Sequence, residues 1–459
     1  MSKGINVSIA CSLALSILTG CSLTPAYERP VAPVANAWTG ATANAPATKA
    51  AADIAWQEYF VDARLKRLIE LALTNNRDLR VAALNVERTQ AQYQIQRAAQ
   101  WPAVNGVFAG QRQAATKDVF TLGVGITSFE FDFFGRIANL KDAALAQYLS
   151  TDESRKTVQI SLVAAVANTY LSLVADDALF AITQETLVTR EQSYKLAKLR
   201  FDNGVTSELD LRQAQGLVEA ARASLAQSQR QRALDENALV LLIGQPLPAD
   251  LPRGEPFAVQ AKLLADVPAG LPSELLNKRP DIRAAEQLLI AANANIGAAR
   301  AAFYPRISLS TSLGKVSGDL SHLLGGGTGW TFAPQLVLPL FNAGANEANL
   351  QATKLARDIA VAQYEKAIQT AFREVADALA SRATLMEQYR ATLAQVEAAQ
   401  ATYKLSELRY NNGVSSYLDL LDAQRSLFTV QTAALQLHLA QLQNQVTLYK
   451  ALGGGWTER

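Results

Sequence analysis

The sequence predicts a mainly α-helical chain with a transmembrane β part and an internal two-fold repeat. Residues 194–215 and 403–424 are identical at 14 of 22 aligned positions, which indicates two copies of one structural unit. Two runs, 137–203 and 345–412, contain neither Gly nor Pro and favour very long helices. Four further segments of about ten residues alternate between apolar and polar side chains, as β-strands do.

The N-terminal residues 1–20 predict a lipoprotein signal peptide. Lys3 precedes an apolar stretch at 5–18, which is too short to cross a bilayer as a permanent helix. The following Leu-Thr-Gly-Cys resembles a bacterial lipobox, which implies cleavage before Cys21 and a diacylglycerol and an N-acyl chain on that residue. Ser22 is compatible with sorting to the outer membrane. The alternative is an ordinary secretory signal with an incidental cysteine.

Composition argues against several classes of function. The net charge of +2, without a concentrated basic patch, argues against a nucleic-acid partner. Cys11 leaves with the signal peptide and Cys21 carries lipid, so no disulfide is expected. His322 and His438 are the only histidines, so too few His and Cys side chains are expected to remain for a metal site. Without a Ser-His-Asp set or a P-loop, no enzyme is expected, and no cofactor beyond the covalent lipid.

The mature chain is expected to begin with a tether. Residues 21–75 would form a lipidated tether, rich in Pro, Ala and Thr up to residue 52, and then an equatorial segment. The first structural repeat is expected at 76–272 and the second at 273–452, because matching short motifs recur at offsets of 203 to 209 residues. A C-terminal tail, 453–459, would follow.

The helical segments predict four columns of equal length. Each uninterrupted run would span roughly 100 Å as one helix. The shorter segments 76–101 and 205–243 together match this length, and so do 281–304 and 414–452. Two columns are therefore expected to be continuous and two broken near their middles. Because the breaks coincide with the Pro-rich segment 244–272 and with the chain termini, we expect a mixed α/β equatorial belt there.

Strands are expected at 104–113 and 121–131 in the first repeat, and at 306–315 and 330–340 in the second. About ten alternating residues is the length of a tilted transmembrane strand. Aromatic side chains near strand ends suit a membrane interface; they are Phe129, Phe131, Phe133, Phe134, Trp330 and Phe332. From periodicity alone, a small soluble sheet is an alternative.

Closure of the sheet favours the membrane interpretation and a trimer. A strand in a bilayer cannot leave an edge unpaired, and transmembrane barrels need at least about eight strands. Three copies of the chain would supply twelve strands with rotational symmetry, and twelve helical columns. The expected assembly is a homotrimeric 12-stranded β-barrel continued by a long α-helical barrel.

Several motifs resemble those of TolC-type outer membrane factors, in the lipoprotein (NodT-type) efflux subgroup. They are the lipobox, the two L-R-[FY]-x-N-G-V turns, the sequence KRPDI at 278–282 and ARAAFYP at 299–305. The resemblance implies a passive outer membrane channel of a tripartite efflux system. Its partners would be a periplasmic membrane-fusion adaptor and an inner-membrane transporter of the RND class, and it would export drugs or other small toxic compounds.

The same resemblance implies a periplasmic gate in the second repeat. Leu418 would form an apolar ring, Asp422 an acidic ring four residues on, and Arg425 would hold Asp422 in the closed state. The first repeat has Gln213 and Gly216 at the last two positions, which fits a gate confined to one hairpin. The alternative is ordinary solvated charge on a helix.

The two helical turns are expected to contact the adaptor at the periplasmic end. The alternative is that their residues merely satisfy the backbone shape of a turn. A rival for the whole chain is a lipid-anchored periplasmic coiled-coil adaptor, which would lack paired ten-residue amphipathic strands. The predicted contact residues are Asn203, Gly204, Val205, Thr206, Ser207, Asn412, Gly413, Val414, Ser415 and Ser416.

Overall fold

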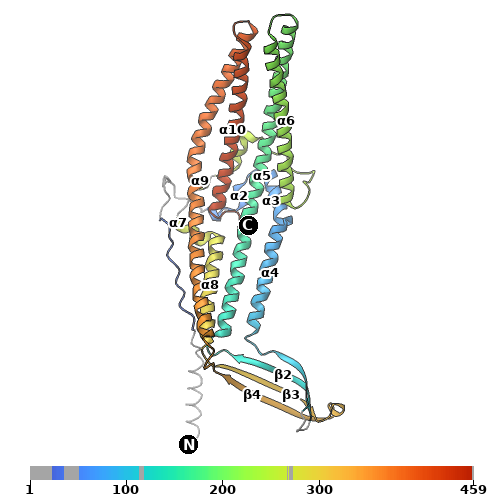
Figure 1. Ribbon diagram of the computed structural model, residues 1–459, viewed down its shortest axis with the longest axis vertical. Helices are drawn as coiled ribbons and strands as arrows, with labels where there is room; N and C mark the ends of the chain where they lie inside the picture. Colours follow the sequence, from blue (N-terminus) through green and yellow to red (C-terminus); the bar gives the residue numbers. More distant parts are fainter. Residues whose placement is uncertain (1–22, 36–50, 113–117, 266, 268–271, 457–459) are drawn as a thin grey trace. The chain divides into compact units, whose positions relative to one another are not determined.

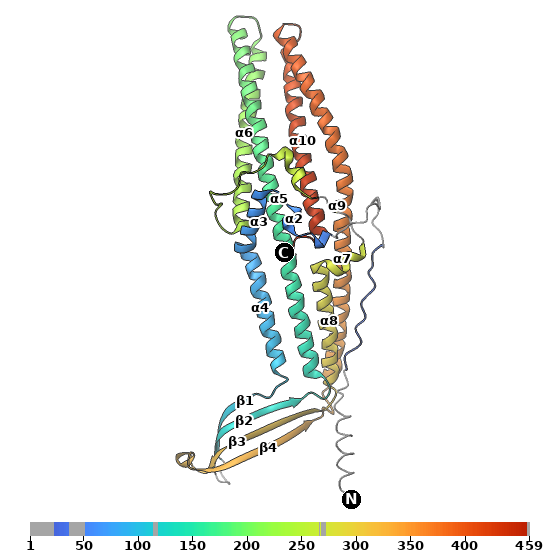
Figure 2. The same cartoon turned by 180° about the vertical axis from the view of Figure 1, so that it is seen from behind.

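The computed structural model describes residues 23–35, 51–112, 118–265, 267 and 272–456. The expected signal peptide, Cys21 and the last residues of the tail lie outside this part of the chain. Helices dominate, and one order of elements occurs twice (Figures 1 and 2). The first copy is α4 (Arg77–Ala98), β1 (Val104–Gln111), β2 (Val119–Phe131), α5 (Arg136–Asp202) and α6 (Glu208–Ile243). The second is α8 (Pro280–Ala301), β3 (Arg306–Ser317), β4 (Gly327–Val337), α9 (Ala345–Asn411) and α10 (Tyr417–Ala451).

Short elements precede and separate the two copies. They are η1 (Ala51–Asp53), α2 (Trp56–Tyr59), α3 (Ala63–Asn75), η2 (Phe257–Leu263), α7 (Pro272–Lys278) and, between β3 and β4, η3 (Leu320–His322). Thus the segment expected as tether and belt contains a 13-residue helix, α3. Asp62 caps that helix by accepting hydrogen bonds from the backbone N–H groups of Arg64 and Leu65.

The last strand is shifted from its expected place at 330–340. Strand β4 begins at Gly327, because its glycine-rich start pairs with the end of β3, Gly327 opposite Val316. It ends at Val337, which lies opposite Arg306, the first residue of its partner strand β3. Strand β1 ends at Gln111, while residue 113, its expected end, lies outside the described residues, and β2 begins two residues earlier than expected.

The chain forms two compact units, and neither coincides with a sequence repeat. Unit 1 comprises the described residues of Met1–Ala32, together with Ala83–Glu153 and Arg283–Ala367. Unit 2 comprises the described residues of Pro33–Ala82, Ser154–Ile282 and Ile368–Arg459. Each unit therefore takes matching parts from both repeats, and both long helices pass from one unit into the other.

Unit 1 contains one antiparallel sheet in the order β1-β2-β3-β4, with β1 and β4 at its edges. Directly opposite residues of antiparallel strands point to the same side. The register sets Leu313 opposite both Val124 and Trp330, so their apolar side chains share a face. That face, called the apolar face below, carries Val104, Phe108, Leu122, Val124, Ile126, Phe129, Phe131, Ile307, Leu309, Leu313, Trp330, Phe332 and Leu336.

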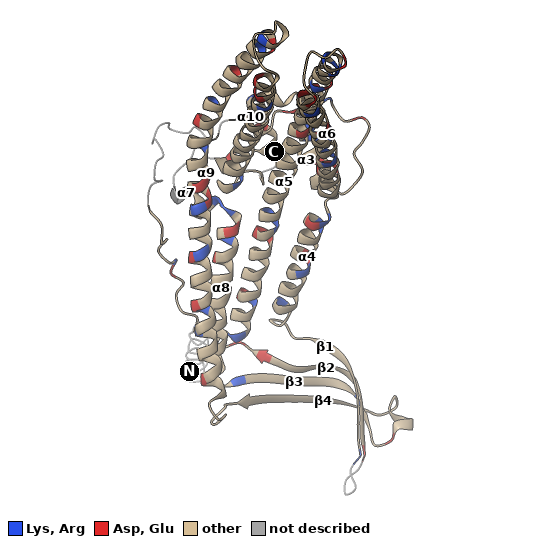
Figure 3. Cartoon of the chain, turned by 45° about the horizontal axis from the view of Figure 1, so that its top comes forward, with Lys and Arg blue, Asp and Glu red and all other residues tan. Residues whose placement is uncertain are grey.

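The apolar face is open. Trp330 and Phe332 keep 75% and 61% of their surface exposed. The opposite face carries small and polar side chains such as Ser308, Ser310 and Ser312. Charged residues are scattered along the helices and are few in the strands (Figure 3). The sheet thus has one polar and one uncovered apolar face.

A β-bulge in β2 keeps the apolar face continuous. Ile126 pairs with Thr311 and Phe129 with Leu309, so three steps along β2 correspond to two along β3. Ser128, inside the bulge, has a φ of 55°, and its backbone N–H donates to Ser310 Oγ at 3.0 Å. Without the extra residue, Phe129 would point to the polar face.

An extended segment beginning at Leu23 is bound to helix α8 in unit 1. Arg300 Nη1 donates to the carbonyl oxygen of Leu23 at 2.9 Å, and Asn293 Nδ2 to that of Pro25 at 2.8 Å. Farther along, Arg29 forms an ion pair with Glu286 at 2.6 Å. These contacts fix the chain two residues after Cys21 to the C-terminal end of α8.

Unit 2 contains two helical hairpins, one formed by α5 and α6 and the other by α9 and α10. They lie side by side, with both turns at the same end (Figures 1 and 2). By length and composition alone, α5 could cross a membrane. However, 61% of its apolar window is buried inside the molecule, as in a core helix.

Candidate functional site

The two helical turns have the same backbone structure. Gly204 and Gly413 have φ values of +73° and +72°, a left-handed conformation that glycine adopts without strain. In the first turn, Val205 N–H donates to Arg200 O and Gly204 N–H to Phe201 O, both at 2.8 Å. The second turn repeats both bonds. This is the Schellman arrangement, which satisfies the last carbonyls of a helix.

The serines of the turns cap the helices that follow. Ser207 Oγ accepts a hydrogen bond from the backbone N–H of Asp210 at 3.2 Å. Ser416 does the same for Asp419 at 3.3 Å, and the Asp419 carboxylate accepts the Ser416 N–H in return, completing a capping box. The residues Asn-Gly-Val and Ser, which occur in both repeats, therefore have a structural role: they form the turn and cap the helix that follows.

The remaining predicted tip residues differ in availability. Asn203 and Asn412 each donate their side-chain amide to a carbonyl of their own helix at 2.7 Å. The two valines are the apolar side chains that the turns leave open: Val205 is 73% exposed and Val414 64%. Among the ten predicted residues, these valines are the best candidates for contact with another protein.

A hydrophobic cluster joins both hairpins just below their turns. Its buried members come from all four helices, so the two turns are held to each other through packed side chains. They are Ala197, Ala214, Leu217, Tyr410, Tyr417, Leu420 and Leu421.

The predicted gate residues lie on α10: Leu418 stands between the cluster members Tyr417 and Leu420, and Asp422 and Arg425 follow the last of them, Leu421. Leu418 is 51% exposed although its neighbours Tyr417 and Leu420 are buried. Asp422 Oδ1 and Arg425 Nη1 are 3.9 Å apart, and both side chains are more than half exposed. A pair with this geometry contributes little stability within one chain. All three side chains are thus open to a neighbouring molecule.

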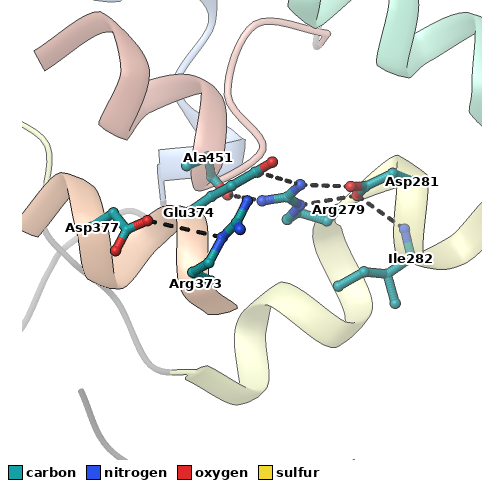
Figure 4. A network of polar contacts seen from close by, with 7 residues as sticks. All are labelled: Arg279, Asp281, Ile282, Arg373, Glu374, Asp377 and Ala451. Carbon is teal, nitrogen blue, oxygen red and sulfur yellow. Dashed lines mark hydrogen bonds and ion pairs between the residues drawn. The ribbon is translucent and has the colours of Figure 1, made fainter. Parts of the chain in front are cut away.

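A buried guanidinium, Arg279, joins three helices of unit 2 (Figure 4). It binds Asp281 through Nε at 2.9 Å and Nη2 at 2.5 Å, Glu374 of α9 at 2.9 Å, and the carbonyl of Ala451 at the end of α10 at 2.8 Å. Its carboxylate partners raise its pKa above the ordinary value against the effect of burial. The motif at 278–282 was visible in the sequence, but not the partners on α9 and α10.

Two carboxyl groups, Asp176 of α5 and Asp235 of α6, interact. Burial and a hydrogen bond with Asp235 raise the pKa of Asp176 to about 7. The charge of Asp177 acts in the same direction, while Arg232, paired with Asp177 at 2.6 Å, opposes it. This pair could not be predicted from the sequence, because its members are 59 positions apart.

The two histidines are not brought together. His438 is buried on α10, stacked on Tyr389 at 4.8 Å and edge-on to Phe257 at 4.9 Å, and burial lowers its pKa. His322 lies exposed in η3. In the described ranges no group of His, Cys, Asp or Glu residues could hold a metal ion.

Comparison with known proteins decides the family. The model of the family described as outer membrane efflux protein matches residues 68–245 and 271–454. The chain belongs to the outer membrane efflux protein family. The expected resemblance is therefore confirmed, and the chain is an outer-membrane efflux channel rather than a periplasmic adaptor. Its relatives are channels, which agrees with a protein that is not an enzyme.

Similar proteins match over nearly their whole length. The toluene efflux pump outer membrane protein TtgC of Pseudomonas putida is 49% identical, covering 98% of this chain and 96% of that protein. A solved membrane protein of Pseudomonas aeruginosa has a TM-score of 0.88 at 43% identity, over 95% and 98% of the two chains. The open state of the MtrE outer membrane channel of Neisseria gonorrhoeae has a TM-score of 0.87 at 39% identity, over 95% and 99%.

Proposed function

We propose that three copies of the chain form one passive exit duct, with a 12-stranded β-barrel in the outer membrane and an α-helical barrel in the periplasm. The four-stranded sheet carries this proposal. Its edge strands β1 and β4 have no further partner in the described part of the chain, and its apolar face is uncovered. Lipid would cover that face, and neighbouring copies would pair both edges.

The duct would receive its substrates from other proteins. A periplasmic membrane-fusion adaptor would contact the two turns, with Val205 and Val414 as apolar contacts, and an inner-membrane transporter of the RND class would supply the energy. Toluene is the compound in the name of the relative TtgC. We therefore expect small apolar toxic compounds, drugs among them, as the exported class.

The gate would close at α10 of each copy. Three copies of Leu418 would form an apolar ring and three of Asp422 an acidic ring. Arg425 would bind Asp422 of its own or a neighbouring chain more closely than the 3.9 Å seen within one chain. The exposure of all three side chains supports this role, because each is free to meet a symmetry mate.

A lipid on Cys21 would anchor each copy in the inner leaflet of the outer membrane. The bond from Arg300 to Leu23 supports this position, because it holds the chain two residues after Cys21 beside the end of α8, just before β3. Labelling cells with radioactive palmitate should mark the wild type and leave Cys21→Ser unlabelled. Equal labelling of both would contradict the assignment.

The trimer itself is tested by electrophoresis and fractionation. Unheated samples from the outer-membrane fraction should migrate as trimers and convert to monomers on boiling. In a strain that lacks its own channel but keeps the pump and adaptor, the chain should restore resistance to toluene. A monomer in the soluble periplasmic fraction would contradict the proposed function.

A further inference from the structure

A half-open cavity lies in unit 2 where α5, α9 and α10 meet. The space inside it and in the open solvent at its mouth together measures about 480 Å³. Its wall includes Arg190 and Thr189 from α5, Tyr403 from α9, and Gln424 and Phe428 from α10. No part of the export mechanism proposed above uses this cavity.

Arg190 is a buried positive charge without a carboxylate partner in the described chain. It is only 6% exposed; its Nη1 donates to Leu217 O at 3.2 Å and its guanidinium lies over the Phe428 ring at 5.4 Å. Its Nε is buried and has no hydrogen-bond partner among the described residues. Burial and the positive charge of Arg425 both lower its pKa, and the phenol of Tyr417 acts weakly in the other direction.

Gln424 offers the complementary group in the same wall. Ser193 Oγ donates to Thr189 O at 3.1 Å, so it can only accept from Gln424, whose Nε2 donates to it at 3.1 Å. This chain of bonds fixes the orientation of the amide. Its Oε1 is then a buried acceptor without a partner in the described chain. The cavity therefore has one charged donor and one acceptor to satisfy.

We propose that the cavity binds a small oxyanion that carries a hydroxyl group, with hydrogen phosphate as the best fit. A guanidinium is suited to the oxygens of such an anion, and a buried charge is strongly stabilised by a counter-ion. The hydroxyl of the anion would donate to Gln424 Oε1. Glu185, exposed at the wall of the same cavity, would weaken binding by repulsion.

The bound anion would also offset the repulsion between Arg190 and Arg425, which belongs to the gate proposed above. Binding itself depends on neither export nor the gate. It can be measured on the purified full-length trimer in detergent, so failure of this inference is separable from failure of the proposed function.

The test is calorimetric titration with sodium phosphate at constant ionic strength in chloride. We expect saturable binding to the wild type, at least tenfold weaker binding to Arg190→Gln, and tighter binding to Glu185→Gln. Arg230→Gln is the matched control, since Arg230 is an exposed arginine of α6, and should bind like the wild type. Arg190→Lys, which keeps the charge, should retain part of the affinity and guards against a folding defect.

Sulfate, which has no hydroxyl at neutral pH, should bind more weakly than phosphate. Sulfate binding as tight as phosphate would overturn the role given to Gln424. Absence of saturable heat with phosphate, or unchanged affinity in Arg190→Gln, would overturn the site itself.

Discussion

The proposed gate residues Asp422 and Arg425 would act only where a second chain is present. Both are exposed and 3.9 Å apart, so within one chain the pair contributes little. In a narrow ring of three copies, water would be restricted and the same charges would interact more strongly. The gate assignment therefore applies to the trimer, and it has to be tested on the trimer.

Conductance in planar bilayers provides that test. Replacing Asp422 or Arg425 by Ala should raise single-channel current, because the closed network loses one of its partners. Gln213→Ala, at the matching position of the first repeat, should leave the current at the wild-type level. Wild-type current in both gate variants would count against the assignment.

The pair formed by Asp176 and Asp235 should make stability depend on pH. The pKa of Asp176 is raised to about 7 in the folded chain, so the folded state binds a proton that the unfolded state has released. Stability should therefore fall as pH rises from about 4, the ordinary value, to about 7, and then level off. Asp176→Asn should remove this part of the pH dependence.

Thermal unfolding of the purified protein between pH 4 and 8 measures this effect. Asp202→Asn is the control, because Asp202 is exposed and paired with Lys198 at 3.1 Å. It should leave the slope between pH 5 and 8 unchanged. Equal slopes in the wild type and Asp176→Asn would contradict the raised pKa of Asp176.

For individual side chains, only contacts between residues close together in the sequence could be predicted. Asp422 and Arg425 are three positions apart on one helix, so their proximity follows from helical geometry. Arg190 and Arg279 find their partners on other helices, Arg279 across 95 and 172 positions. The partners of these two arginines cannot be derived from distances along the sequence, because they depend on how the helices pack.

Among the elements, the helical turns are the ones that local sequence determines most completely. Each Asn-Gly was predicted as a turn between helices, and both copies have the same Schellman bonds. The serine caps that follow were not predicted. A left-handed glycine cannot be replaced without strain, whereas a helical glycine can.

Two glycines should therefore respond in opposite directions. Gly413→Ala should destabilise the second hairpin by about 1 kcal/mol, because its φ is +72°. Gly216→Ala, inside α6 with nothing within 4 Å of the new methyl group, should stabilise the first by up to about 1 kcal/mol. Amide hydrogen exchange in each hairpin would measure both; stabilisation by Gly413→Ala would contradict the turn geometry.

The strands were predicted from alternation, but the bulge was missed. The sequence did contain its signal, since Phe129 and Phe131 are out of phase with Leu122, Val124 and Ile126. A bulge adds one residue to the strand and so returns the apolar residues after it to the same face as those before it. The start of β4 was missed for another reason: glycine has no side chain, so its glycine-rich start shows no alternation of apolar and polar side chains.

For the whole molecule, the two faces of the sheet make a prediction about membrane assembly. Phe332 lies on the apolar face and its neighbour Ala333 points to the other. In the proposed barrel, Phe332→Lys would place a charge in lipid at a cost of about 2–4 kcal/mol, while Ala333→Lys would face water. The yield of heat-modifiable trimers in the outer membrane should fall for the first variant only.

Equal trimer yields from both variants would contradict a lipid-facing apolar face. The family and the mainly helical, duplicated order of elements were predictable because motifs and periodicities are local. The composition of the two compact units was not, because it depends on which parts of the two repeats meet.

Unit 1 contains strands from both repeats, and this determines when its sheet can form during synthesis. The central strand pair of the sheet joins β2 to β3, with Ile126 opposite Thr311, so the sheet cannot be completed until most of the chain has left the ribosome and crossed the inner membrane. Until then, β1 and β2 have an open edge and an apolar face in water. Such long-range pairing is slow and exposes the chain to aggregation. The duplicated architecture therefore leaves the apolar residues of β1 and β2 uncovered until the second repeat has been made, so the order of synthesis matters to this sheet.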